Sequence, residues 1–126
     1  MDKMGAFPPE IRMNRIYHNP RCSTSRKALE ALQATGQPVE VVEYLHALPP
    51  RDTLRALIQA AGLTVRDALR SKESVYETLG LSDPALSDEQ LLDAIEQHPV
   101  LLNRPFVVTD KGTRLCRPFE TLHEIL

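Results

Sequence analysis

The chain has 126 residues, 25% of them charged, and a formal net charge of −2 at pH 7, the balance of an ordinary soluble globular protein. This length can bury the core of one domain, and the charge gives no general reason to expect nucleic acid or an acidic membrane as a partner. No apolar run approaches the roughly 18 residues of a membrane span, and the opening residues lack the pattern of a signal peptide. We therefore expect a cytoplasmic monomer with a short N-terminal tail, residues 1–14.

A strand–helix–strand unit follows the tail. Residues 15–18 have the pattern of a short strand, which Pro20 ends, and residues 23–35 have apolar positions at helical spacing before Gly36. Residues 39–45 are β-branched and partly alternating, which is typical of a second strand. Because a helix joins the two strands, we expect them to pair in parallel with a right-handed crossover.

A helical insertion over about residues 51–98 comes next. Apolar spacing and Gly or Pro breaks divide it into short segments, and Ser87 and Gln90 fit a capping box. The pattern predicts helices at residues 51–61, 64–70, 74–79 and 87–97. The insertion is too apolar for a linker, so we expect it to form a helical layer of the same domain.

The end of the chain returns to strands. Two strand patterns flank a turn at residues 110–112, which predicts a hairpin, and "FETLHEIL" has the pattern of a final amphipathic helix. The order is therefore βαβ, a helical insertion, then ββα. With four strands in a mixed sheet this is an α/β fold of thioredoxin-like arrangement, which we expect to form one domain over residues 15–126.

Cys22 stands where the first helix begins. A thiol becomes a nucleophile as its thiolate, and a helix N-terminus favours negative charge through its unpaired amides and dipole. Residues 23–25 offer hydroxyls and amides that can cradle a thiolate or an incoming anion, while Arg26 and His18 can add positive charge. The polar surroundings favour a reactive thiol over the alternative, a cysteine buried as a small hydrophobe.

Cys116 alternates with Leu115 and Arg117 on a predicted strand, away from any helix start, so we expect it to pack in the core. The two cysteines form neither a CxxC motif nor a Cys/His cluster with zinc spacing. We therefore expect no metal site and a reducing compartment. A disulfide between Cys22 and Cys116 stays open, although nothing in the sequence requires one.

Two arginines flank the predicted hairpin, and each precedes a proline: Arg104 in "NRPF" and Arg117 in "CRPF". Singly, each is more often a solvated surface residue, but at one end of a hairpin they can bind one tetrahedral oxyanion with their planar forks of donors. Arg70 is a third candidate, which the sequence does not distinguish from Arg66. Pro105 begins the strand after the insertion, where thioredoxin-like folds commonly hold a cis proline; a trans proline at a strand start is the alternative.

The segments "IYHNPRCSTSR", "HPVLLNRPFVVT" and "GTRLCRP" resemble, in order and spacing, those of the bacterial arsenate reductases that use glutathione and glutaredoxin. The resemblance runs from residue 15 to residue 126 and implies a thioredoxin-like core with Cys22 as nucleophile. It further implies oxyanion-binding Arg70, Arg104 and Arg117 and thiolate-supporting His18, Asn19 and Ser25. Well-characterised members have glycine after the cysteine, whereas Ser23 here adds a side chain beside the anion cradle and restricts the backbone.

The resemblance implies that Cys22 attacks arsenate while the arginines neutralise the developing charge. Glutathione then adds to the arsenic, and glutaredoxin takes over the glutathione as arsenic becomes trivalent and leaves as arsenite. The second thiol thus arrives from solution, and no resolving cysteine is needed. We expect arsenate, glutathione and glutaredoxin as partners, glutathione as a co-substrate, and no tightly bound cofactor.

Three other functions fit part of the pattern. A glutathione-linked thiol oxidoreductase with another substrate would keep Cys22 and Pro105 but would not need converging arginines. A regulatory module of the same fold that binds RNA polymerase usually carries CxxC, whereas the residue three after Cys22, where the second cysteine of that motif would stand, is Ser25 here. A low-molecular-weight phosphatase needs an arginine at position 28, and Ala28 excludes it.

Overall fold

The computed structural model describes residues 13–126, which divide into two compact units. The sheet unit comprises residues 13–43 and 104–126, and the helical unit comprises residues 44–103. The predicted tail lies outside the described residues as far as residue 12. Asn14, which we had placed in that tail, is already the first residue of the sheet.

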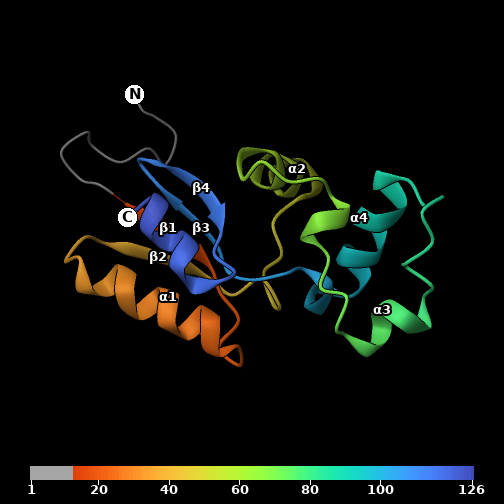
Figure 1. Ribbon diagram of the computed structural model, residues 1–126, viewed down its shortest axis with the longest axis horizontal. Helices are drawn as coiled ribbons and strands as arrows, with labels where there is room; N and C mark the ends of the chain where they lie inside the picture. The colour runs from red at the N-terminus through yellow and green to blue at the C-terminus, as the bar shows by residue number, and fades with distance from the viewer. Residues whose placement is uncertain (1–12) are drawn as a thin grey trace. The chain divides into compact units, whose positions relative to one another are not determined.

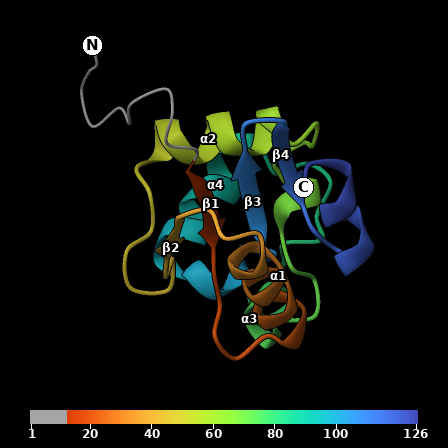
Figure 2. The same cartoon turned by 90° about the vertical axis from the view of Figure 1, so that its left-hand side faces the viewer.

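The sheet unit contains a mixed four-stranded sheet, as predicted (Figures 1 and 2). Its strands are β1 (Asn14–Tyr17), β2 (Val39–Val42), β3 (Phe106–Thr109) and β4 (Gly112–Leu115), in the order β2-β1-β3-β4. β1 pairs with β2 in parallel and with β3 antiparallel, and β3 and β4 form the antiparallel hairpin. β2 is shorter than predicted because β1 ends at Tyr17 and its last link to β2 is the bond from the His18 amide to the Val42 carbonyl, 2.8 Å.

Helix α1 (Ser23–Ala34) lies across one face of the sheet (Figure 2). Its Ala28 and Leu32 recur at helical spacing and are fully buried against Ile16 of β1 and Val107 of β3, so their apolar area stabilises the packing of helix on sheet. The helix ends at Ala34, and Gly36, just beyond the C-cap residue Thr35, has a φ of 81°, a left-handed conformation that glycine adopts without steric cost.

The last segment is a 3₁₀ helix, η3 (Phe119–Glu124), and not the α-helix that its pattern predicted. Its turns close over three residues, as in the bond from the Ile125 amide to the Leu122 carbonyl, 3.1 Å. In a 3₁₀ helix residues three apart lie in line. Leu122 and Ile125 therefore enter the same core, where both are buried.

The helical unit has its own apolar core. Its elements are α2 (Arg51–Ala60), η1 (Arg66–Ala68), α3 (Ser74–Thr78), α4 (Asp88–Gln97) and η2 (Pro99–Leu101). The helix predicted over residues 64–70 is only the short η1, because Leu69 turns extended and pairs with Leu102 in an isolated bridge. Across residues 13–126, no helix has the length and apolar character needed to cross a membrane.

Arg51 joins α2 to α4 by charge. Its guanidinium lies 3.1 Å from Glu89 and 2.7 Å from Glu96, and it also pairs with Asp93. Arg55 adds a contact of 2.8 Å to Glu89. The group is solvent-exposed, so it orients the two helices more than it stabilises them.

The capping box at the start of α4 provides a test of the helical unit. The Gln90 amide donates to Ser87 Oγ at 3.2 Å, and the Ser87 amide donates to Gln90 Oε1 at 2.8 Å. We expect Ser87→Ala to lower the free energy of unfolding by about 1 kcal/mol, because a helix-terminal amide loses its acceptor. Urea unfolding followed by circular dichroism measures this. Ser82→Ala, at an exposed serine, should change it by less than about 0.5 kcal/mol, and equal losses would contradict the cap.

Candidate active site around Cys22

A tight turn between β1 and α1 presents Cys22. The Cys22 amide donates to the Asn19 carbonyl at 3.0 Å, and the Arg21 amide donates to Asn19 Oδ1 at 2.9 Å. Cys22 itself is the extended N-cap residue of α1, and its carbonyl accepts the first helical bond from the Arg26 amide, 3.0 Å. The sulfur is thereby held at the helix N-terminus, where unpaired amides favour negative charge.

The pKa of the Cys22 thiol is lowered from 9.0 to about 7. Burial raises this pKa, but it is outweighed by the Ser25 amide, the side chains of Arg117 and Arg104, and the Thr24 amide. No side-chain hydrogen bond caps α1 at Cys22, so the two amides act on the sulfur as nearby dipoles. A large share of the thiol is therefore ionised at neutral pH, as a nucleophile requires.

Arg104 and Arg117 meet at the same end of the hairpin, as their positions in the sequence indicated. Arg104 directly precedes Pro105 and β3, Arg117 follows β4, and the Cys116 amide donates to the Pro105 carbonyl at 2.8 Å. Arg117 Nη1 lies 3.4 Å from Cys22 Sγ and 3.1 Å from the Arg104 carbonyl oxygen. Two guanidinium groups thus act on one sulfur, and one of them is oriented by the backbone of the other.

The peptide bond between Arg104 and Pro105 is cis, as the thioredoxin-like arrangement implied. A second cis bond joins Arg117 to Pro118, and the sequence analysis did not anticipate it. The repeated "RPF" was the available signal, because both arginines of the site precede a proline. Both arginines are therefore attached to the same unusual backbone geometry.

His18, Asn19 and Ser25 form a buried group below the thiol. His18 Nδ1 lies 2.7 Å from Ser25 Oγ, which also accepts the Asn19 amide at 3.1 Å. Burial lowers the pKa of His18, which outweighs the opposite effect of Glu43. Burial thus favours the neutral imidazole and disfavours the positive charge that we expected His18 to add. Its contact is with Ser25, whose amide faces the sulfur.

Ser23 is the first residue of α1, and its side chain is exposed. The backbone at this position is helical, a conformation that serine adopts without strain. Serine in place of the glycine of well-characterised relatives is therefore compatible with this local geometry.

Cys116 is fully buried in the core of the sheet unit, as predicted. Burial raises the pKa of its thiol to about 12, so it stays protonated and unreactive at neutral pH. Cys22 and Cys116 are both free thiols in the structure. The reactive and the structural cysteine are thus separated by burial and by their charged neighbours.

Arg70, Arg104 and Arg117 are the three arginines predicted to bind the oxyanion, called the oxyanion clamp below. Arg70 belongs to the helical unit. Its amide donates to the Leu101 carbonyl at 2.7 Å, and its Nε donates to Glu73 at 3.1 Å. Arg66, in contrast, donates from both Nη atoms to the carbonyls of Leu81 and Asp83 at 2.8 Å. The side chain of Arg66 thus has a structural role within the helical unit, so Arg70 is the better candidate for binding the oxyanion. A role of Arg70 at the anion stays a prediction.

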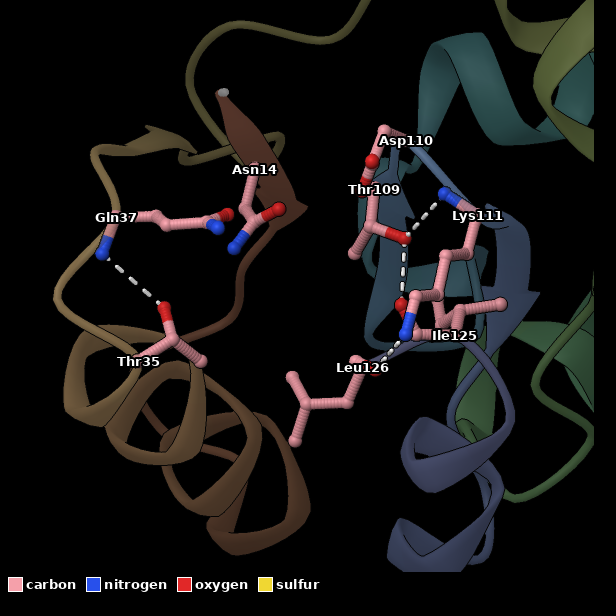
Figure 3. Close-up of a pocket in the computed structure, with 8 residues that line it drawn as sticks. All are labelled: Asn14, Thr35, Gln37, Thr109, Asp110, Lys111, Ile125 and Leu126. Carbon is pink, nitrogen blue, oxygen red and sulfur yellow. Dashed lines mark hydrogen bonds between the residues drawn. The ribbon is translucent and has the colours of Figure 1, made fainter. Parts of the chain in front are cut away.

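A cavity of about 270 Å³ opens at the other end of β1 (Figure 3). It is lined by Asn14, Thr35, Gln37, Thr109, Asp110, Lys111, Ile125 and Leu126. Several of its polar groups are bound to one another, as in the bond from Thr109 Oγ1 to the Ile125 carbonyl, 2.6 Å (Figure 3). No cysteine lines it, and Cys22 follows the opposite end of the strand, so this cavity is not the thiol site.

The fold and the site together define a class of protein. The sheet has the strand order β2-β1-β3-β4, and an ionisable thiol lies at the start of the first helix. This combination defines a thioredoxin-like thiol protein. Two arginines act on the sulfur of this protein, and no second cysteine completes a CxxC motif. Residues 17–125 match the ArsC family, and the chain belongs to that family.

Proteins of similar sequence are named arsenate reductases. The chain is 56% identical to the arsenate reductase of Rhizobium meliloti (strain 1021) and 49% identical to that of Escherichia coli (strain K12). Each match extends over 111 residues, which is 88% of this chain and 79% of the relative. Among solved structures it is similar to an arsenate reductase from Vibrio cholerae, with a TM-score of 0.86 and 42% identity, covering 92% of this chain and 99% of that one.

The thiolate can be tested by alkylation. We expect iodoacetamide to modify Cys22 at a rate that rises with pH around a midpoint of about 7, because only the thiolate reacts. Arg117→Gln should move the midpoint upward, since one group that favours the thiolate is lost. Mass spectrometry of quenched samples gives the rates.

Arg114→Gln is the matched control, because Arg114 pairs with Glu124 at 2.9 Å and does not contact Cys22. Its midpoint should equal that of the wild type. An unchanged midpoint in Arg117→Gln would contradict the contact between Arg117 and the sulfur. Cys116 should stay unmodified in all of these proteins.

Proposed function

We propose that this protein reduces arsenate to arsenite, with glutathione and glutaredoxin as electron donors and Cys22 as nucleophile. The observation that carries the proposal is the Arg117 guanidinium 3.4 Å from Cys22 Sγ, beside Arg104. It pairs a thiolate with donors suited to a tetrahedral oxyanion. The arsenate reductases of similar sequence support the choice of arsenate.

In the first step the Cys22 thiolate attacks arsenic. A sulfur–arsenic bond forms, an arsenic–oxygen bond breaks, and the leaving oxygen takes up protons and departs as water, while arsenic stays pentavalent. Arg117 and Arg104 neutralise the oxygens on which negative charge develops. Both arginines act on the Cys22 sulfur before substrate arrives, so their side chains need little reorganisation when arsenate binds.

The electrons come from two external thiols. The glutathione thiol forms a second sulfur–arsenic bond and releases a further water. A glutaredoxin thiolate then attacks the glutathione sulfur, and the electron pair of the breaking sulfur–arsenic bond stays on arsenic, which becomes trivalent. Water replaces Cys22 on arsenic, which frees arsenite and the thiol. Cys116 is a poor resolving thiol because it is buried and its pKa is about 12.

Three further features follow from this chemistry. A single chain contains Cys22, Arg104 and Arg117, so a monomer suffices. Glutathione enters as a co-substrate, and no tightly bound cofactor is needed. The reaction requires free thiols, and we place it in the reducing cytoplasm.

The test is arsenate-dependent oxidation of NADPH in the presence of glutathione, glutaredoxin and glutathione reductase. Cys22→Ser should abolish turnover, because the nucleophile is lost. Arg104→Ala should lower kcat/KM for arsenate about a hundredfold, as expected for removal of a donor to a developing oxyanion. Arg114→Ala, away from the sulfur, should stay close to the wild type.

A second outcome would favour another function. If the wild type shows no turnover with arsenate while Cys22 reacts readily with glutathione disulfide, a glutathione-linked thiol oxidoreductase with a different substrate becomes the better assignment. Loss of turnover in Cys22→Ser together with full activity in Arg104→Ala would keep the nucleophile and overturn the clamp.

The third arginine needs a separate test. If Arg70 binds arsenate, Arg70→Gln should lower kcat/KM for arsenate by about tenfold or more without affecting unfolding. Arg66→Gln should leave kcat/KM for arsenate unchanged. It removes hydrogen bonds to two carbonyls and should lower the free energy of unfolding by about 1 kcal/mol. Steady-state kinetics and urea unfolding of both variants distinguish the two. Equal kinetics for Arg70→Gln and the wild type would remove Arg70 from the site.

A further inference from the structure

A second set of basic residues flanks Cys22 in the sequence, in addition to Arg104 and Arg117, which act on its sulfur. Arg21 directly precedes Cys22, and Arg26 and Lys27 follow it on α1; all three are exposed. The first turn of α1 contains no acidic residue, and none occurs anywhere in residues 18–29. This local charge is notable in a chain whose formal net charge is −2.

The three residues differ in the contacts that their side chains already make. Arg26 Nη1 donates to the Pro20 carbonyl at 2.8 Å, so its guanidinium braces the turn that presents Cys22. Arg21 lies on that turn with its amide bonded to Asn19 Oδ1, and its exposed side chain forms no hydrogen bond or ion pair with residues 13–126. Arg21 thus has an exposed charged side chain, and hydrogen bonds fix its backbone.

Lys27 is placed by an aromatic ring. Its Nζ lies 6.0 Å from the centroid of the Phe119 ring, and Phe119 follows Arg117 by two residues. Lys27 is only about 7.5 Å along the helix axis from Cys22, at 1.5 Å per residue. Its ammonium group lies over a ring of the segment that also contributes Arg117, which contacts Cys22 Sγ.

On the proposed function, a second anionic reactant must also reach Cys22. On the proposed function, glutathione arrives when Arg104 and Arg117 are engaged by the oxygens bound to arsenic. Glutathione has a carboxylate at each end of its backbone and a thiol between them. Its sulfur must approach arsenic while both carboxylates remain charged, so cations outside the oxyanion clamp are the suitable partners.

We propose that Arg21 and Lys27 form a glutathione-binding subsite, in which each receives a carboxylate of the tripeptide and thereby orients its sulfur toward Cys22. This inference rests on the proposed function for the identity of the adduct. The subsite itself can be tested without arsenate. Arg21 and Lys27 are positioning residues, because they do not touch the reacting atoms.

The test uses thiol–disulfide exchange at Cys22. The Cys22 thiolate attacks one sulfur of a disulfide, a mixed disulfide forms, and the other half leaves as a thiolate. Rates are compared for anionic glutathione disulfide, neutral 2-hydroxyethyl disulfide and cationic cystamine. A change in the pKa of Cys22 affects all three, so the ratio of the rates isolates recognition of charge.

We expect Arg21→Ala and Lys27→Ala each to slow the reaction with glutathione disulfide about threefold relative to the neutral disulfide, and the double variant to slow it about tenfold. Cystamine should react relatively faster with the double variant. Arg21→Lys should restore most of the rate, and Lys111→Ala, in the turn between β3 and β4, should leave every ratio unchanged. Unchanged ratios in the double variant would overturn the subsite.

Turnover with arsenate separates this inference from the proposed function. In the double variant the KM for glutathione should rise about tenfold while the KM for arsenate is unchanged, since the oxyanion clamp is intact. If the wild type fails to turn over arsenate, the proposed function fails, and the exchange ratios still decide the subsite. If turnover succeeds and neither the ratios nor the KM for glutathione change, the subsite alone is wrong.

Discussion

Burial and hydrogen-bond donors act in opposite directions on the Cys22 sulfur. Partial burial disfavours the thiolate, and the amides at the start of α1 together with Arg117 and Arg104 favour it strongly enough to bring the pKa to about 7. The rest of the site serves this balance. The turn at Asn19 sets the position of the sulfur, and buried His18 contacts the Ser25 hydroxyl at 2.7 Å. The same donors are suited to a tetrahedral oxyanion, so on the proposed function one arrangement both ionises the nucleophile and prepares the substrate site.

The hairpin explains why two arginines distant in sequence from Cys22 reach it. Arg104 lies just before β3 and Arg117 just after β4, so pairing of the two strands brings both arginines to one end. β3 also pairs with β1, whose end leads into the turn that carries Cys22. Each guanidinium is thus attached to the sheet at a defined place. The interaction of Arg117 with the Arg104 carbonyl fixes one arginine by means of the other.

Much of the fold could be predicted from local pattern. The spacing of Ala28 and Leu32 identified α1, Ser87 and Gln90 identified the start of α4, and the capping box is present as predicted. The prediction failed where tertiary pairing overrides local preference. Leu69 leaves a helical pattern to pair with Leu102. The last segment, rich in apolar residues, tightens into a 3₁₀ helix that buries residues three apart.

The sequence by itself determined which atoms are available for chemistry: one cysteine before a helix start, two arginines each preceding a proline, and no acidic residue near the thiol. These features are local and can be recognised along the chain. Only the tertiary structure decided the charge state of the groups. Cys22 and Cys116 have the same side chain, yet their thiols have pKa values of about 7 and about 12, and burial lowers the pKa of His18. A pKa depends on burial and on neighbours brought from distant parts of the chain, and these exist only once the chain has folded.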